Sequence, residues 1–374
     1  MARPVLMSER APAPFALKDI HLIQAHSPET IQRTWANNKQ EWGTTIDTDT
    51  YYTRERHLGT QGFASQGKLK FWILVPTTFN PEHPDLDLIL AALETYDRPG
   101  MVATKEHGVK DVQVMSIASV FTPVQYRGHG YASHMMKLLW KDIEAMERVA
   151  FTTLYSDVGP EFYGRLGWKP MRSDELVIPT SHPVADAESI VLDSVTDKDL
   201  LGVIQRDVQL VRGSLQAHLD ESSASSPSTV VVVVTPEPNC FQWMHARSKF
   251  AAQHMLKLDQ HEITTLGAKD PCSDSFVLWM HHLLENKLYI LRWRLDEKAG
   301  DATARALIGA AQREAQKWSL PTVVLWNPEQ SLADLLGLDV KTRDKKSIPS
   351  LGLTSPAFKA DNIEWILSEK YAWC

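Results

Sequence analysis

A short segment rich in glycine, with an arginine and a histidine, carries the residues best suited to chemistry in this chain. It reads SIASVFTPVQYRGHGYA, residues 116–132. The apolar stretch Ser116–Thr122 predicts a strand that Pro123 ends, and an amphipathic helix is predicted to begin near Gly130. Backbone N–H groups at a helix N-terminus bind anions, and glycines let a phosphate approach the main chain because they lack a Cβ. The loop is therefore predicted to bind a pyrophosphate through Arg127, Gly128, His129, Gly130, Tyr131 and Ala132.

Other interpretations of this loop are weaker. A dinucleotide-binding loop requires GxGxxG, but Ser133 stands where the third glycine should be, and the GxxxxGK[ST] pattern is absent. A glycine turn that binds nothing would explain the two glycines alone. The complete unit of strand, proline, RGHGYA loop and helix favours a phosphate-bearing cofactor, with Arg127 adding positive charge and His129 contributing only its backbone N–H.

The loop resembles the motif [RQ]-x-x-G-x-[GA] of the GNAT superfamily of N-acetyltransferases, which Arg127, Gly130 and Ala132 match. The resemblance implies an α/β (α+β) fold with a central mixed sheet, splayed strands and flanking helices. It also implies acetyl-CoA as cosubstrate and no metal. The loop would bind the coenzyme A pyrophosphate, and the strand before it would splay from its neighbour. Main-chain groups of that strand would then bind the pantetheine and the thioester carbonyl, at Ala118, Ser119 and Val120.

A second motif of the same family follows the next predicted strand. The segment FYGRLGW, residues 162–168, matches the family's short helix, and the resemblance implies that Tyr163 donates to the departing thiolate. An ordinary core tyrosine is the alternative. Together the two motifs cover about residues 110–170.

Further residues are similar to those of the fungal lysine N6-acetyltransferases: Glu94-Thr95, Arg98-Pro99 and SDVGPEFYGRLGW. This resemblance implies that the ε-amine of free L-lysine is acetylated in lysine breakdown. A protein or peptide acetyltransferase would use the same motifs. A non-catalytic acyl-CoA-binding module is the other alternative.

The general base is harder to assign. An alkylamine is almost fully protonated at neutral pH, so a group must remove its proton. We expect Glu94 to reach the site, although a surface ion pair between Glu94 and Arg98 explains it equally well. The carboxylate of Cys374 is another candidate, and a docked terminal strand would also explain the aromatic segment KYAWC. Arg98 or Arg172 would bind a substrate carboxylate, and the alternative for each is an arginine that simply faces water.

Regular elements must hold these residues in place. Ser27 is predicted to cap a helix through about Asn37, and two strands are expected over Leu69–Val75 and Ile89–Glu94. After the loop helix we expect a strand over Phe151–Tyr155 and a short helix that ends at Gly167.

The second half repeats this order of elements. A strand over Lys287–Leu295, a helix over Ala302–Trp318 and a strand over Thr322–Trp326 precede a short helix. We therefore expect a catalytic GNAT domain over residues 1–180 and a degenerate GNAT-like domain over 181–374, joined at Pro179–Glu188. The second loop, DEKAGD at 296–301, is acidic, and Ala333 falls where the first half has Tyr163, so no coenzyme A is expected there.

Composition limits the function classes. The net charge is −7 without a long Lys/Arg run, which disfavours nucleic acid as a partner. Three cysteines without CxxC spacing favour a reducing compartment and no zinc or disulfide, and His281-His282 with Glu285 is interpreted as a solvated strand or loop. No apolar stretch reaches membrane-spanning length and no targeting peptide is evident, so we expect a cytoplasmic protein with a small amine, L-lysine, as its partner. The oligomeric state stays open.

Overall fold

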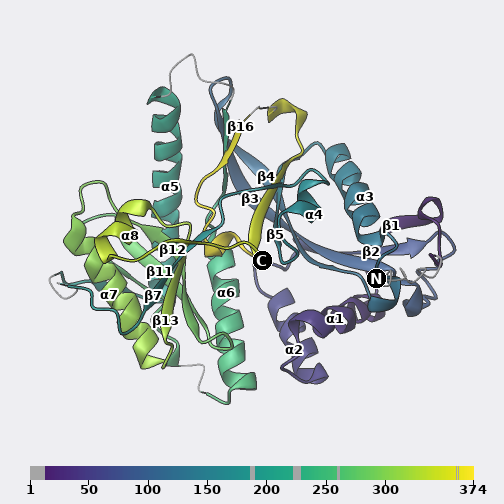
Figure 1. Cartoon of the computed structure of the whole chain (residues 1–374), viewed down its shortest axis with the longest axis horizontal. Helices are drawn as coiled ribbons and strands as arrows, with labels where there is room; N and C mark the ends of the chain where they lie inside the picture. The colour runs from purple at the N-terminus through teal and green to yellow at the C-terminus, as the bar shows by residue number, and fades with distance from the viewer. Residues whose placement is uncertain (1–12, 186–189, 222–228, 259–261, 359, 361) are drawn as a thin grey trace, which may run out of the picture.

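The computed structural model describes residues 13–185, 190–221, 229–258, 262–358, 360 and 362–374. Within these residues the strands form a nine-stranded and a seven-stranded sheet that lie side by side (Figure 1). The nine-stranded sheet runs, in spatial order, through β1 (Ile20–Ala25), β2 (Leu69–Pro76), β3 (Ala91–Thr104), β4 (Gly108–Phe121), β5 (Val149–Ser156), β15 (Ile348–Leu353) and β6 (Lys169–Pro170). In addition, β9 (Thr229–Val234) pairs with β3, and β16 (Asn362–Trp365) pairs with β9.

The seven-stranded sheet contains most strands of the second half. Its spatial order is β14 (Lys341–Thr342), β7 (Asp174–Pro179), β13 (Thr322–Trp326), β12 (Lys287–Arg294), β11 (Phe276–His282), β10 (Gly267–Lys269) and β8 (Asp193–Val195). Both sheets are mixed. β4 pairs in parallel with β5, β16 with β9, and β12 with β13, whereas the other pairings are antiparallel.

Each sheet is covered by an amphipathic helix of the same kind. On α3 (Tyr131–Ala145), the side chains of Met135, Met136, Leu139 and Ile143 are fully buried against the first sheet. On α7 (Asp301–Lys317), Leu307, Ile308, Ala311 and Ala315 are buried in the same way against the second. Burial of these apolar stripes holds both helices in place. The other helices are α1 (Pro28–Trp42), α2 (Thr48–Gly59), α4 (Glu161–Gly164), α5 (Asp197–Glu221) and α8 (Gln330–Leu336).

One helix of the second half joins the two sheets into a common core. α6 (Pro238–Phe250) lies between them (Figure 1), and its buried side chains Phe241, Trp243 and Met244 belong to a cluster with residues of both sheets. The segment Lys370–Ala372 forms a 3₁₀ helix that packs on α6 and β12. The end of the chain thus lies at the junction of the two halves.

The two sheets also exchange a strand. β7 follows α4 in the chain but pairs with β13 of the second sheet, whereas β15 follows α8 and pairs with β5 of the first. The predicted domain boundary at residue 180 stays a prediction. Each sheet contains a strand from the other side of that boundary. Residues 186–188 of the predicted linker lie outside the described part of the chain. Because each sheet needs a strand from the other half, we expect the two halves to unfold together.

The strand that precedes each amphipathic helix has the same irregularity. β4 loses β5 as a partner after the Ile117–Leu154 pair, and its register against β3 shifts just beyond, between Glu94 and Ala92. β12 loses β13 after the Ile290–Leu325 pair, and its register against β11 shifts at the same point. Each shift is a β-bulge, which bends the strand away from its neighbour.

The predicted elements are largely confirmed. Ser27 caps α1, accepting a hydrogen bond from the N–H of Thr30 at 3.2 Å, and the helix continues to Trp42. The predicted mixed sheet with splayed strands and flanking helices is present, and so is the second GNAT-like region. The expectation of a docked terminal strand at KYAWC is wrong, because Lys370–Ala372 forms a 3₁₀ helix.

Candidate active site

A cavity of about 490 Å³ opens where β4 and β5 separate, a volume typical of small-molecule sites. Its lining combines the first half with α6 and the last residues of the chain. Among the predicted site residues, those that line it are Glu94, Ala118, Ser119, Val120, Arg127 and Tyr163. On the side facing β5, residues 118–121 pair with no strand among the described residues. This leaves an extended backbone edge at the cavity, suited to a linear amide-containing ligand.

The bulge in β4 brings a hydroxyl to a buried carboxylate. Ser119 has a φ of +53°, a left-handed conformation that turns its side chain toward β3. Its hydroxyl donates to Oε2 of Glu94 at 3.0 Å, and Nδ2 of Asn38 lies 3.4 Å from Oε1 of Glu94. The backbone irregularity thus places a carboxylate and a hydroxyl together at the mouth of the splayed strands.

Burial makes Glu94 a strong base for a carboxylate. Only 6% of the residue is exposed. Burial, and then the charge of Glu55, raise the pKa of Glu94 to about 8, although the Ser119 hydrogen bond opposes this shift. A group with this pKa takes up a proton readily near neutral pH, as general-base catalysis requires.

The glycine loop has the conformation that its sequence predicts. Gly128 and Gly130 have φ values of +83° and +82°, which residues with a Cβ rarely adopt. Among the residues that the structure describes, no side chain caps α3. Nε of Arg127 donates to the carbonyl of Thr122 at 2.9 Å, and its guanidinium lies over the Phe121 ring. This arrangement fits a pyrophosphate, because backbone donors, the helix dipole and a cation converge there.

The remaining loop residues lie beside the cavity and do not line it. The Tyr131 side chain is buried and points away from the loop, since its hydroxyl donates to the carbonyl of Phe15 at 2.9 Å. The His129 ring packs against that of Tyr131. That His129, Tyr131 and Ala132 bind an anion through their main chain stays a prediction.

Tyr163 is the residue of the second motif that reaches the cavity. It lies on α4, is 8% exposed, and burial raises the pKa of its phenol. Its backbone carbonyl accepts from the N–H of Trp168 at 3.1 Å, with Gly167 at a φ of +106° between them. This helix-ending arrangement holds the tyrosine at the edge of the cavity.

Two arginines predicted to bind a substrate carboxylate do not reach the cavity. Arg98 is buried and donates to the carbonyl oxygens of Ala372 at 2.7 Å and Tyr371 at 3.2 Å. It therefore fixes the end of the chain, and the predicted surface pair with Glu94 is wrong. Arg172 donates to Asp174 at 2.8 Å and to the carbonyl of Pro328 at 2.7 Å.

The structure brings to the cavity several residues that the sequence did not reveal. Arg54 and Glu55 come from α2, and Arg247 comes from α6 of the second half. Nε and a terminal nitrogen of Arg54 donate to Oε1 of Glu55 at 2.9 and 2.6 Å. The apolar periodicity of α2 and α6 gives no sign of these positions, since each points toward a site built by other segments. Cys374 also lines the cavity, and the role of its carboxylate as a base stays a prediction.

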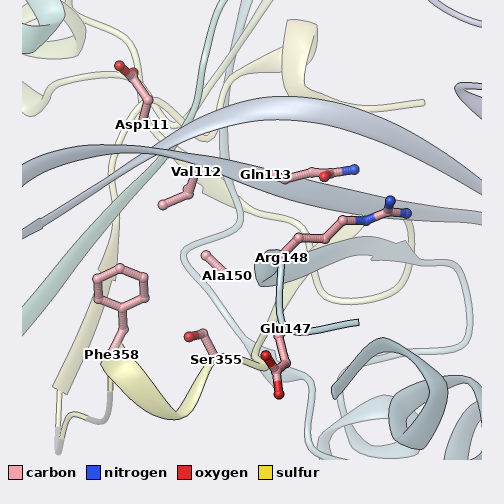
Figure 2. A pocket seen from close by; sticks show the side chains of 8 residues that line it. All are labelled: Asp111, Val112, Gln113, Glu147, Arg148, Ala150, Ser355 and Phe358. Carbon is pink, nitrogen blue, oxygen red and sulfur yellow. The ribbon is translucent and has the colours of Figure 1, made fainter. Parts of the chain in front are cut away.

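A second hollow lies at the other end of the β4–β5 pair and lacks these features. It has a volume of about 390 Å³ and is lined by residues such as Gln113, Glu147 and Arg148. Figure 2 shows that the carboxylates of Asp111 and Glu147 point away from each other. No convergent set of polar groups forms there among the lining residues, so the cavity at the splayed end is the candidate active site.

Histidines and acids do not gather into a metal centre in the described part of the chain. The interpretation of His281 as solvated is wrong, since it is buried on β11 and its Nε2 lies 2.8 Å from Oε1 of Glu314. No helix among the described residues has the length and apolar character needed to cross a membrane.

Comparison with known families places the chain. The LYC1 GNAT-like C-terminal domain matches residues 177–374, and the Acetyltransferase (GNAT) domain matches residues 101–171. The first match spans more than half of the 374 residues. The chain belongs to the LYC1-like GNAT acetyltransferases. The second match contains both motifs that resemble the GNAT family, and membership makes the protein an acetyl-CoA-dependent N-acetyltransferase.

Individual relatives agree with this family. A lysine acetyltransferase of Yarrowia lipolytica is 24% identical, over 94% of this chain and 100% of the relative. An uncharacterized protein of Saccharomyces cerevisiae is 21% identical, over 92% of this chain and 96% of the relative.

Solved structures share the fold over nearly the whole chain. The GCN5-related N-acetyltransferase from Kribbella flavida has a TM-score of 0.56 at 18% identity, covering 91% of this chain and 72% of that one. A probable N-acyltransferase from Enterococcus faecalis V583 has a TM-score of 0.52 at 14% identity, covering 90% and 72%. The GNAT fold of this chain is thereby confirmed.

Proposed function

We propose that the protein acetylates the ε-amine of free L-lysine, with Glu94 as general base and Tyr163 as proton donor. The observation that carries this proposal is the buried Glu94–Ser119 pair at the open end of the splayed strands, in the same cavity as Tyr163. The lysine acetyltransferase of Yarrowia lipolytica, similar over its whole length, supports lysine as the acceptor.

Each group has a separate task in the reaction. Acetyl-CoA, when bound, supplies the activated acetyl group and a thiolate leaving group. Glu94 takes a proton from the lysine ammonium, so that the nitrogen lone pair can form the new C–N bond. Main-chain N–H groups of residues 118–120 polarise the carbonyl oxygen, as preorganised donors do in other acyl transfers. Tyr163 donates its proton to the sulfur as the C–S bond breaks.

The balance of protons is complete. The ammonium gives up two protons in becoming an amide. Glu94 removes the first and passes it to solvent, and the second leaves the nitrogen for solvent after the C–N bond has formed. The phenol of Tyr163 regains from solvent the proton that it gave to the sulfur, so each turnover releases one proton. Burial raises the pKa of Tyr163, so the phenol stays protonated throughout the neutral range and is ready to donate.

The test offers the protein acetyl-CoA with either L-lysine or a lysine-containing peptide, and follows thiol release and product mass. We expect N6-acetyllysine from the free amino acid and slow turnover of the peptide. Faster turnover of the peptide would make the protein a peptide acetyltransferase. Acetyl-CoA binding without thiol release for any amine would make it a non-catalytic acyl-CoA-binding module.

A further inference from the structure

One arginine at the cavity makes no direct ion pair with a carboxylate of the described residues, although Glu55 acts on its charge from a distance. Arg247 projects from α6, and its guanidinium carbon lies 5.9 Å from the ring centre of Trp243 and 5.5 Å from that of Trp373. Among the described residues its side chain has no ion-pair or hydrogen-bond partner. An unpaired cation in a partly buried position is costly unless something else compensates it.

The neighbouring arginine, Arg54, does have a carboxylate partner. Arg54 makes two hydrogen bonds to Glu55 and lies over the Tyr51 ring at 4.5 Å, so its charge is already satisfied within the protein. Burial, and then repulsion from Arg54, lower the pKa of Arg247 to about 10. An anionic ligand would oppose both effects, since it would add the missing opposite charge.

The aromatic contacts leave Arg247 suited to bind such a ligand. A guanidinium lying against indole faces is held in orientation, and its N–H donors lie in its own plane, where they can meet a carboxylate in a bidentate arrangement. Trp243, Trp373 and Arg247 border the cavity that also contains Glu94. A ligand carrying an amine at one end and a carboxylate at the other can therefore contact the base and the cation together.

We propose that Arg247 binds the α-carboxylate of the amino-acid acceptor and makes the enzyme selective for free amino acids over amines that lack this group. This inference rests on the proposed function. It gives the second half a direct part in the active site, because α6 supplies the specificity-determining residue while the first half supplies the chemistry.

The test compares two acceptors that differ only at this group: L-lysine, and L-lysinamide, in which a neutral amide replaces the carboxylate. In the wild type we expect kcat/KM to be about 100-fold higher for L-lysine, the size of a charge-assisted hydrogen bond. Arg247→Met should raise KM for L-lysine by about the same factor with little change in kcat, and should leave L-lysinamide unaffected. Arg247→Lys keeps the charge but loses the planar guanidinium. Its KM for L-lysine should lie between those of the wild type and Arg247→Met.

Lys249→Met is the matched control. It removes one positive charge from the same helix, but Lys249 pairs with Asp197 at 3.0 Å and does not border the cavity. Its kcat/KM for both acceptors should equal that of the wild type. Thermal unfolding curves of each variant check that the fold is retained.

The outcomes separate this inference from the function on which it rests. Suppose that the wild type acetylates L-lysine and that kcat/KM of both Arg247 variants falls by the same factor for the two acceptors. Arg247 is then structural and the inference is wrong. If the wild type acetylates neither acceptor, the proposed function fails first and the inference fails with it. Loss confined to L-lysine supports both.

Discussion

The two halves contain the same splayed strand pair, and only the first leaves it open. In the first half, β4 departs from β5 beyond Ile117 and a cavity occupies the space. In the second, β12 departs from β13 beyond Ile290, but Glu369 fills the equivalent place. Its carboxylate accepts from the backbone N–H of Trp293 at 3.0 Å and from Arg292 at 2.7 Å. The backbone N–H of Trp293, on the edge that could bind a cosubstrate, is thus already paired within the chain.

The second half also lacks the carboxylate that the first half has beside its splayed strands. Thr95 pairs with Ile117 and Trp279 with Ile290, so the residue before each on its strand is Glu94 in the first half and Leu278 in the second. The short helices also correspond, because Leu338 donates to the carbonyl of Ala333 at 3.0 Å just as Trp168 donates to that of Tyr163.

The loops before the two long helices differ as well. In the second half, Oδ1 of Asp296 accepts from the N–H of Lys298 at 2.9 Å, and Gly300 has an extended φ of −85°. The first loop instead has two glycines at positive φ. The two halves thus share a fold but differ in the side chains and the backbone edge to which the proposed function assigns catalysis.

The largest effect is expected for Glu94→Gln, which gives the first half a neutral side chain at its base position. If Glu94 removes the amine proton, kcat/KM should fall by about 10²–10⁴-fold, while acetyl-CoA affinity stays unchanged. In the wild type, kcat/KM should rise with pH as Glu94 loses its proton, with an apparent pKa near 8. This rise of kcat/KM with pH should be missing in Glu94→Gln. A variant with wild-type rate and pH profile would transfer the base role to another group.

Tyr163→Phe makes the first half resemble the second, in which Ala333 provides no hydroxyl. If the phenol donates to the departing thiolate, as proposed, kcat should fall by about 10²-fold with little change in substrate KM. Burial raises the pKa of Tyr163, so the wild type should show no loss of kcat from phenol ionisation up to the ordinary tyrosine range near pH 10. Equal kcat values, measured where chemistry limits turnover, would make Tyr163 a packing residue.

Arg292→Met tests what keeps the second half closed. Arg292 is buried, donates to Asp207 at 2.8 and 2.9 Å, and also pairs with Glu369. Its removal leaves two buried carboxylates without their partner, so the free energy of unfolding should fall by about 3–5 kcal/mol in urea titrations. Arg206→Met is the control, since Arg206 makes the same bidentate contact with Asp274 at the surface. A variant as stable as the control would contradict this role of Arg292.

The features that were predicted correctly from the sequence are those encoded by short local motifs. The RGHGYA loop and the FYGRLGW helix each lie within a few residues, and their conformations follow from glycine and from helix ends. Arg247 and Arg98 could not be assigned in this way, because Arg247 contacts Trp373 and Arg98 contacts Tyr371 and Ala372, all more than a hundred residues away in the chain. The exchange of β7 and β15 has no local signal either, since neither DELVIP nor IPSLGL specifies which of the two sheets it joins. His281 shows the same limit, as its partner Glu314 lies on another element.

The most direct test of a single site in the first half is the stoichiometry of acetyl-CoA binding by calorimetry. The difference between the two loops predicts one acetyl-CoA per chain. Arg127→Glu should abolish this binding, whereas Lys298→Glu, the same charge reversal in the second loop, should leave it unchanged. Two molecules bound per chain, or wild-type affinity in Arg127→Glu, would contradict the account.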